Sequence, residues 1–264
     1  MMFTQFLRDR GIDRVPGRGG KPWAIAHRGY SGAVPENTMA AIDAARALEA
    51  DFIEIDVHLS ADGTPLVLHD PTLNRTTDAS GAVANLSDEQ ISLADAGSWL
   101  GPGFAGQRIP HLDAVLYSMS FRGGWLLLEL KGDWEAGGVA AVVDLITQHG
   151  MADRVVLQSF SQHTLHNCQA IAGHIPRILL RVVPKEGDVE LVQRLEGIGY
   201  APSFRGFKSR RELVEEIREL DLCVNVHTVD APEGWDALLS AGVSGIITNQ
   251  LGRLQGYLAA KFDV

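Results

Sequence analysis

Two short acidic strings each end a run of apolar residues. Glu54 and Asp56 lie in the sequence DFIEIDV, and Glu129 lies in WLLLELK, which ends at Lys131. Alternate side chains of an extended strand share one face, so Glu54 lies on the same side as Asp56, and the lysine on the same side as Glu129. Carboxylate oxygens without thiolates or several imidazoles suit a hard ion such as Mg²⁺ or Ca²⁺. We therefore expect these three carboxylates to hold one divalent cation.

Titratable side chains follow other apolar runs. His27 and Arg28 come after the sequence WAIA, and His69 comes after PLVL. Beside a hard cation, these groups and Lys131 have the chemistry to attack a phosphate ester. The cation and Arg28 would neutralise the phosphoryl oxygens, while one imidazole removes a proton from the nucleophile and the other protonates the leaving oxygen. Histidine suits both tasks because its unperturbed pKa is about 6.5.

Apolar runs alternate with helical patterns along the chain, which is typical of βα units on a parallel sheet. Eight strands are expected, at Trp23–His27, Phe52–His58, Trp125–Lys131, Val155–Ser159, Ile178–Val183, Tyr200–Pro202, Leu222–His227 and Gly245–Thr248. The expected helices are Asn37–Glu49, Leu112–Ser118, Val139–His149, Gln162–Ile171, Val189–Leu195, Ser209–Leu220, Pro232–Ala241 and one from Leu251 onward. This pattern predicts an α/β fold, the TIM (β/α)8 barrel, whose active site lies at the C-terminal ends of the strands. The alternative, a doubly wound sheet, usually has a Gly-rich turn after its first strand, where this chain has HRG.

One connection is much longer than the others. Residues 71–110 follow the second expected strand and are rich in Gly, Ser, Asp and Thr, with aromatic residues at Trp99 and Phe104. A long connection within a compact domain is usually functional. We expect a single TIM-barrel domain over residues 1–264, in which residues 71–110 form a small insertion that caps the barrel mouth.

Composition limits the possible partners and the location. The 264-residue chain has a formal net charge of -10, which argues against a nucleic-acid partner. Cys168 and Cys223 are isolated in apolar segments, so we expect no disulfide and a reducing, cytoplasmic location. Residues 1–21 lack the apolar core of a secretory signal, and no run approaches the roughly 18 apolar residues of a membrane span. We expect a small-molecule substrate and no stable membrane association; the sequence does not fix the oligomeric state.

Five motifs together resemble the glycerophosphodiester phosphodiesterase family. They are His27-Arg28-Gly29, Pro35-Glu36-Asn37-Thr38, Glu54-Ile55-Asp56-Val57, His69-Asp70 and Glu129-Leu130-Lys131. The sequences AGSW and IPHL in the insertion and GVSGIIT near the end continue the resemblance, which covers nearly everything from Trp23 to Leu254. Each motif alone is weak, whereas five in order with a matching insertion are specific.

The resemblance implies a TIM barrel that hydrolyses glycerophosphodiesters to sn-glycerol 3-phosphate and an alcohol. The residues it implies are Glu54, Asp56 and Glu129 for the cation, His27 and His69 as general acid and base, and Arg28 and Lys131 for the phosphate. Glu36 would tether Arg28 and Asp70 would steer His69, although a helix N-terminal charge and a turn residue are equally good interpretations of these two acids. The glycerol 2-hydroxyl would attack phosphorus, and water would then open the cyclic phosphate.

Two positions depart from the family pattern. His227 lies at the end of the seventh expected strand, where members often carry Trp, and Asn249 lies after the last strand, where they often carry Asp. His227 could reshape the wall that packs against the substrate, or simply make a strand-end hydrogen bond. The alternative functions are a lysophospholipase D-type phosphodiesterase on a lipid substrate and a non-catalytic barrel that binds phosphodiesters or a metal. A non-catalytic barrel should have lost a histidine or a carboxylate, and this chain retains all of them.

Two other groups of polar residues are expected to be solvated surface. His163 and His166 are three residues apart on an expected helix, far from the strand ends. A small basic cluster near the start of the sixth expected helix contains Arg205, Lys208, Arg210 and Arg211. The cluster could touch an anionic head group only if it faces the mouth.

Overall fold

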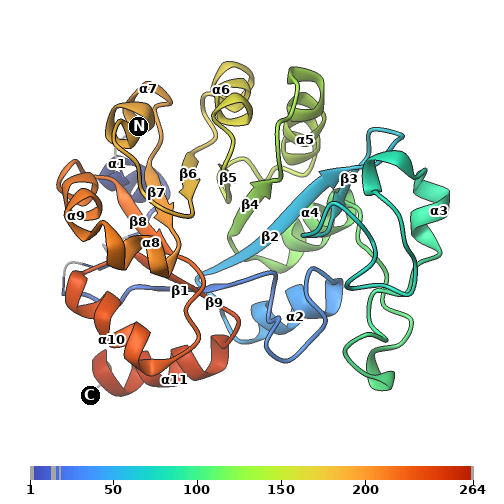
Figure 1. Cartoon of the computed structure of the whole chain (residues 1–264), viewed down its shortest axis with the longest axis horizontal. Coiled ribbons are helices and arrows are strands. Elements are labelled where there is room, and N and C mark those ends of the chain that lie inside the picture. The colour runs from blue at the N-terminus through green and yellow to red at the C-terminus, as the bar shows by residue number, and fades with distance from the viewer. Residues whose placement is uncertain (1–2, 13–15, 18, 263–264) are drawn as a thin grey trace.

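The computed structural model describes residues 3–12, 16–17 and 19–262. Eight parallel strands close into a barrel with helices on the outside (Figure 1), which confirms the predicted TIM fold. The strands are β1 (Trp23–Ala26), β2 (Phe52–Leu59), β4 (Leu126–Leu130), β5 (Val155–Ser159), β6 (Arg177–Arg181), β7 (Gly199–Pro202), β8 (Cys223–Val226) and β9 (Gly245–Thr248). The barrel closes because β1 pairs in parallel with both β2 and β9.

The helices lie close to their predicted positions. They are α2 (Met39–Ala47), α4 (Leu112–Arg122), α5 (Ala136–Gln148), α6 (Gln162–Ile171), α7 (Asp188–Arg194), α8 (Phe204–Ser209), α9 (Arg211–Glu219), α10 (Pro232–Ala241) and α11 (Leu251–Phe262). The single helix predicted over Ser209–Leu220 is wrong at its start. Ser203 caps α8 by accepting a hydrogen bond from the Gly206 amide at 3.0 Å, and Arg210 then breaks the helix with φ -139° and ψ 45°.

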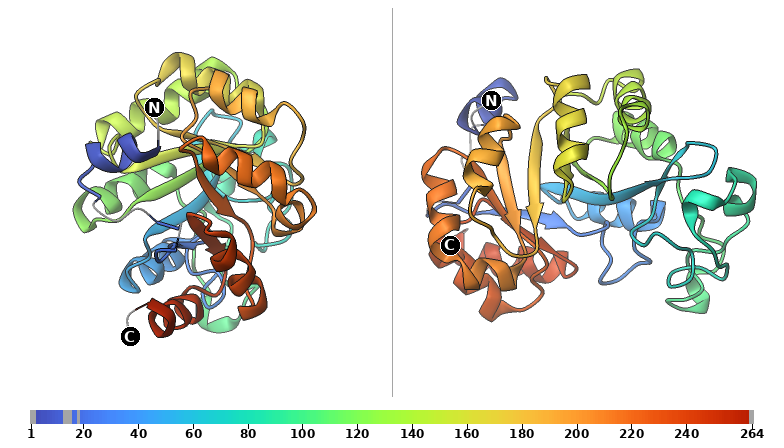
Figure 2. Two further views of the ribbon diagram at one scale, coloured as in Figure 1. Left: turned by 90° about the vertical axis from the view of Figure 1, so that its left-hand side faces the viewer. Right: turned by 45° about the horizontal axis from the view of Figure 1, so that its top comes forward.

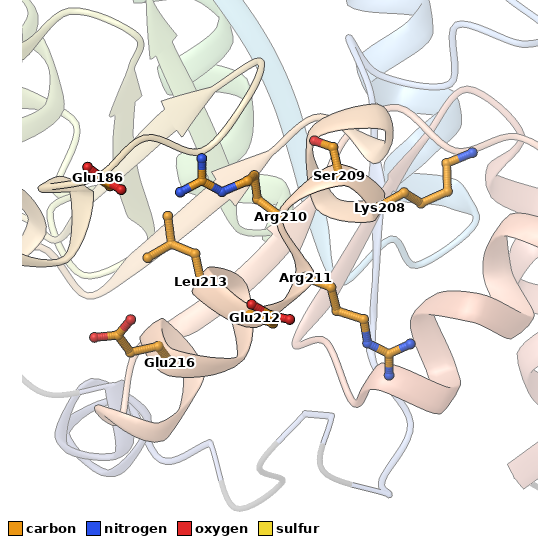
Figure 3. A pocket seen from close by; sticks show the side chains of 8 residues that line it. All are labelled: Glu186, Lys208, Ser209, Arg210, Arg211, Glu212, Leu213 and Glu216. Atoms are coloured by element: carbon orange, nitrogen blue, oxygen red, sulfur yellow. The ribbon is translucent and has the colours of Figure 1, made fainter.

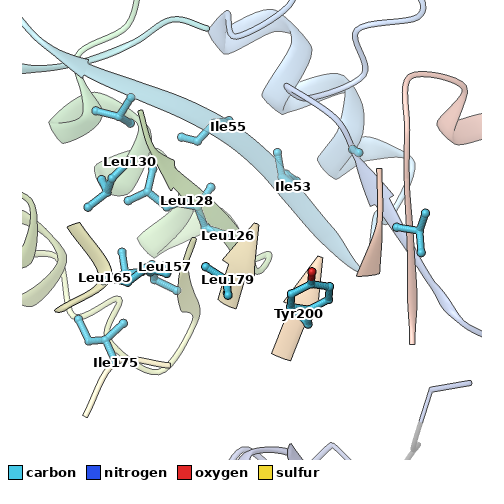
Figure 4. Close-up of a cluster of buried hydrophobic side chains, with 14 of the residues drawn as sticks. Ile53, Ile55, Leu126, Leu128, Leu130, Leu157, Leu165, Ile175, Leu179 and Tyr200 are labelled. Carbon is cyan, nitrogen blue, oxygen red and sulfur yellow. The ribbon is translucent and has the colours of Figure 1, made fainter. Parts of the chain in front are cut away.

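The strands alternate between an inner and an outer face, as their sequences predict. On β2, Ile53 and Ile55 belong to the apolar layer between the sheet and the helices, together with Leu126 and Leu128 of β4 (Figure 4). Phe52 belongs instead to the cluster inside the barrel. Because side chains alternate along a strand, the acidic residues of β2 and β4 point inward with Phe52 and away from the helices.

A helix that the sequence analysis did not predict closes the N-terminal end of the barrel. Helix α1 (Phe3–Asp9) buries Phe3 and Phe6 against Trp23 and Phe52, the first residues of β1 and β2. The Phe3 ring meets the Trp23 ring edge to face, with centroids 5.5 Å apart. This aromatic plug fills the N-terminal end of the barrel, which leaves the C-terminal end for polar side chains.

The long connection between β2 and α4 builds a small substructure of its own. It begins with β3 (Pro65–Val67), which pairs antiparallel with the end of β2, and continues through η1 (Val83–Asn85), α3 (Asp88–Ser92) and η2 (Pro102–Phe104). Its separate apolar cluster contains Leu66, Leu68, Leu73, Val83, Ile91, Ala94, Ala96 and Ile109. Figures 1 and 2 place this segment beyond the C-terminal end of β2, opposite α1.

Within the part of the chain that is described, no helix is long and apolar enough to cross a membrane.

Candidate active site

A row of polar side chains crosses three neighbouring strands inside the barrel. Asp56 of β2 is in register with Glu129 of β4, which is in register with Gln158 of β5. Glu54 lies two residues before Asp56 on the same face of β2. All three carboxylates are buried, and one oxygen from each lies within 4.8 Å of the others. The predicted carboxylates therefore meet at one point.

Two cationic side chains border these carboxylates. Lys131 Nζ lies 2.9 Å from Glu129 Oε1 and 3.3 Å from Asp56 Oδ1. On the other side, Arg28 Nε lies 3.3 Å from Asp56 Oδ2, and the Arg28 backbone amide donates to Glu54 Oε2 at 3.0 Å. The left-handed backbone of Arg28, with φ 57°, turns this amide toward the carboxylate as the chain leaves β1. Asp56 is thus held between both cations.

The charges of this group do not balance. Three carboxylates face two cations, which leaves one negative charge without compensation in a buried place. Burial and the neighbouring carboxylates raise the pKa of Glu54 well above its ordinary value, and burial together with Asp56 likewise raises the pKa of Glu129. Burial also favours neutral Asp56, but Lys131 and Arg28 hold its pKa below the usual range. The group is therefore arranged to accept additional positive charge.

His27 is fixed in one orientation by a chain of hydrogen bonds. Asp230 accepts from Asn249 Nδ2 at 2.7 Å, so the other amide atom, Oδ1, faces His27 Nδ1 at 2.7 Å. An amide oxygen only accepts, and the His27 Nδ1 atom must therefore carry the proton. Burial lowers the pKa of His27 to about 4, so the ring is neutral near pH 7. Its Nε2 atom is left as a proton acceptor.

His69 is bound differently, by a carboxylate. Its Nδ1 atom lies 2.6 Å from Asp70 Oδ1, and Arg75 contacts the same carboxylate. Hydrogen bonds from Arg75, and to a lesser degree from His69, hold the pKa of Asp70 below its usual range despite some burial. Ionised Asp70 accepts a hydrogen bond from His69 Nδ1 and thereby fixes the orientation of the ring. The expected link between Asp70 and His69 is present.

Residues 35–38 hold the carboxylates and Arg28 from one side. Glu36 Oε1 accepts from Arg28 Nη1 at 2.7 Å, as the resemblance implies. Asn37 Nδ2 donates to Asp56 Oδ2 at 2.9 Å, and Thr38 caps α2 by accepting from the Ala41 amide at 3.2 Å. One short turn therefore starts a helix and positions two site residues.

The structure also places residues in the site that sequence reasoning missed. Asn37 and Arg75 contact the predicted residues, and Gln158 donates to Glu54 Oε1 at 3.2 Å. A small cavity at the centre of the mouth is lined by His27, Glu54, Glu129, Gln158, Phe160, Leu180, His227 and Ile247. Gln158 is the next-to-last residue of β5, as Glu129 is of β4, and this matching position was a usable signal. No sequence signal indicated Arg75, because it reaches the site only through the fold of the insertion.

A second hollow lies on the surface between the β6–α7 connection and α9 (Figure 3). Three residues of the predicted basic cluster line it, namely Lys208, Arg210 and Arg211, and Glu186 is among the acidic residues that face them. Arg211 Nε lies 2.9 Å from Glu215, and Lys208 Nζ lies 4.5 Å from the centre of the Phe204 ring. All four residues of the basic cluster are exposed, so the cluster is solvated surface, as expected.

The central site gathers what the hydrolysis of a phosphate diester requires. It has one imidazole with a nitrogen that can accept a proton, a second imidazole bound to a carboxylate, two cations, and three carboxylates whose oxygens suit a divalent ion. These groups lie at the C-terminal ends of barrel strands, where enzymes of this fold carry out their chemistry. The fold and the site define the class of a phosphoric diester hydrolase.

Comparisons with known proteins indicate the same class of enzyme. A glycerophosphodiester phosphodiesterase of Caldanaerobacter subterraneus subsp. tengcongensis is 35% identical over 231 residues, which are 87% of this chain and 94% of the relative. The structure of an Oleispira antarctica phosphodiesterase in complex with the product sn-glycerol-3-phosphate has a TM-score of 0.85 at 30% identity, and the match covers 89% of this chain and 96% of that one. A glycerophosphodiester phosphodiesterase structure from Agrobacterium tumefaciens has a TM-score of 0.75 at 29% identity, covering 88% and 98%. The model of the glycerophosphoryl diester phosphodiesterase family matches residues 27–253, and the chain belongs to this family.

Proposed function

We propose that this enzyme hydrolyses small glycerophosphodiesters to sn-glycerol 3-phosphate and an alcohol with one divalent cation, using His27 as the first general base and His69 as the first general acid. The observation that carries the proposal is the meeting of three buried carboxylates with two differently bound imidazoles at one barrel mouth. The different partners of the two rings support the assignment, because burial keeps His27 neutral with Nε2 as a proton acceptor, whereas His69 Nδ1 is bound to a carboxylate.

The carboxylates Glu54, Asp56 and Glu129 would hold the cation. Their oxygens suit Mg²⁺ or Ca²⁺. Burial and neighbouring carboxylates raise the pKa of Glu54 and of Glu129, and a bound cation would stabilise the charged forms of both. When bound, the cation would neutralise charge on the phosphoryl oxygens. Arg28 and Lys131 would contact the same oxygens.

In the first step, His27 Nε2 would take the proton of the glycerol 2-hydroxyl as its oxygen bonds to phosphorus. The bond from phosphorus to the alcohol breaks, and His69 Nε2 gives its proton to the departing oxygen. The products of this step are the free alcohol and a cyclic phosphate. His27 is then protonated and His69 is neutral.

In the second step the two histidines would exchange roles. Neutral His69 takes a proton from water as the water oxygen bonds to phosphorus, and His27 returns its proton to the 2-oxygen as the ring opens. The result is sn-glycerol 3-phosphate and the starting protonation states. Both rings lie at the same mouth, so no group has to move between the steps.

The surroundings of the site support two further parts of the proposal. The segment of residues 71–110 would cap the mouth, since its Arg75 is tied to Glu36 and Asp70. A cytoplasmic location is supported by Cys168 and Cys223, which are buried free thiols. We expect the chain to act there as a single catalytic domain.

The test measures release of glycerol 3-phosphate from glycerophosphocholine and glycerophosphoethanolamine with Mg²⁺, with Ca²⁺ and with EDTA. Product should require a cation and should fall by at least 100-fold in His69→Ala. His166→Ala serves as control, because His166 is exposed on α6. A diester that lacks the 2-hydroxyl should be cleaved poorly; efficient cleavage would exclude the cyclic intermediate. If folded enzyme releases no glycerol 3-phosphate from these substrates but frees choline from lysophosphatidylcholine, the lipid-substrate alternative is correct.

A further inference from the structure

Two polar atoms of the central cavity have no hydrogen-bond partner among the residues that the structure describes. They are Nε2 of His227 and Oε1 of Gln158, both shielded from solvent. Gln158 is only 2% exposed, and its amide is fixed because Nε2 donates to Glu54. Both side chains line the same cavity as His27 and Glu129. Buried polar atoms are normally paired, so two unpaired atoms in one cavity point to a ligand group that pairs with them.

The position of His227 is well determined by the surrounding chain. Its backbone amide donates to the Pro202 carbonyl at 3.1 Å, at the end of β7. Its ring meets the Phe160 ring edge to face, with centroids 5.8 Å apart. Burial lowers the pKa of the ring, and hydrogen bonding to the backbone of Ala201 and Arg181 acts against that effect. Its Nε2 atom still has no hydrogen-bond partner among the described residues, and the residue lines the cavity.

The lining of the cavity suits a short polyol. Phe160, Leu180 and Ile247 supply apolar walls, while His227 and Gln158 supply the unpaired polar atoms. A hydroxyl group both donates and accepts, so one hydroxyl can satisfy an amide oxygen and an imidazole nitrogen together. The cavity also borders Glu54 and Glu129, which places such a group next to the reacting phosphate.

We propose that His227 Nε2 and Gln158 Oε1 bind the terminal hydroxyl of the substrate's glycerol unit and thereby select glycerol over other vicinal diols. The proposal rests on the glycerophosphodiester substrate described above. A substrate that lacks this hydroxyl would leave His227 Nε2 and Gln158 Oε1 buried without a partner, so it should be bound less well than the glycerol compound. His227 and Gln158 are thus binding residues that determine specificity at this site.

The test compares two substrates that differ in one atom. Glycerophosphocholine is matched by the phosphocholine diester of propane-1,2-diol, which keeps the 2-hydroxyl and lacks only the terminal one. Wild-type enzyme should prefer the glycerol compound by about tenfold or more in kcat/KM, the effect of one buried hydrogen bond. In His227→Phe the preference should fall below about threefold, because only the glycerol compound loses a contact. Gln158→Met should reduce the same preference, and the double variant should lose little more.

Binding of the product provides a measurement that is independent of turnover. The dissociation constants of sn-glycerol 3-phosphate and of propane-1,2-diol 1-phosphate should differ in wild type and converge in His227→Phe. His166→Phe on α6 is the control for replacing a histidine by phenylalanine. Equal losses on both ligands would overturn the subsite, since His227 would then act on another part of the substrate or on the fold. Absence of turnover of either diester by wild type would instead count against the proposed function, and the two binding constants would still decide the subsite.

Discussion

Arg75 holds Asp70 with two parallel hydrogen bonds, Nε to Oδ2 at 2.7 Å and Nη2 to Oδ1 at 2.9 Å. The same guanidinium reaches Glu36, with Nη1 2.8 Å from Oε2 and Nη2 2.8 Å from Oε1. Asp70 orients His69, and Glu36 holds Arg28. One residue of the insertion therefore connects His69, the proposed proton donor, with Arg28, the proposed phosphate-binding cation.

Replacing Arg75 should impair catalysis more than folding. In Arg75→Gln, Asp70 and Glu36 each lose the two hydrogen bonds from the guanidinium. We therefore expect kcat/KM for glycerophosphocholine to fall by about 10- to 100-fold. The side chain is 43% exposed, so the ion pairs contribute little to stability and the unfolding temperature should change by only a few degrees. Arg122→Gln, which removes the exposed ion pair with Asp43, is the matched control. Unchanged kcat/KM in Arg75→Gln would show that the network does not position the site.

Most of the fold and the predicted site could be derived from the sequence, for a physical reason. Parallel strands bring their C-terminal ends to one edge, so residues such as Glu54, Glu129 and His27 meet whatever the details of packing. Arg75 could not be found in this way, since its place depends on how an irregular segment folds. Helix α1 was missed because a seven-residue helix has few periodic positions, and its stability comes from aromatic packing against Trp23.

Asn249 should set the pH range in which His27 accepts a proton. Because His27 must be neutral to act as base, activity should fall as the pH drops toward its pKa of about 4. In Asn249→Asp, a carboxylate beside Nδ1 stabilises the charged ring, so the acid side of the kcat/KM profile should move to higher pH by about one unit or more. Asn249→Leu removes the hydrogen bond without adding charge, and it should lower the rate without that shift. An identical acid limb in wild type and Asn249→Asp would contradict the assignment of His27 as base.

His227 should make the protein sensitive to acid. Burial lowers its pKa to about 4 in the folded state, against about 6.5 in the unfolded chain. The unfolded chain therefore binds more protons between these values, and stability is lost as the pH falls from 6.5 to 4. Removing this titration in His227→Phe should reduce the difference in unfolding free energy between pH 8 and pH 5 by about 2 kcal/mol. Denaturant titrations at both pH values measure it, and a variant with the wild-type difference would show that His227 is charged when folded.

Occupation of the carboxylate group by a cation should appear as a gain in stability. A ligand at 100 times its Kd stabilises the folded state by about 2.7 kcal/mol, which for a chain of this size raises the unfolding temperature by about 5–10 °C. Glu129→Gln should abolish that rise, because an amide lacks the charge that holds the ion. Without metal the variant should be at least as stable as wild type, since burial and Asp56 already raise the pKa of Glu129 and make its charged form unfavourable. Thermal unfolding with EDTA, Mg²⁺ and Ca²⁺ tests both points, with the exposed Glu89→Gln of α3 as control. A full metal-dependent rise in Glu129→Gln would place the cation elsewhere.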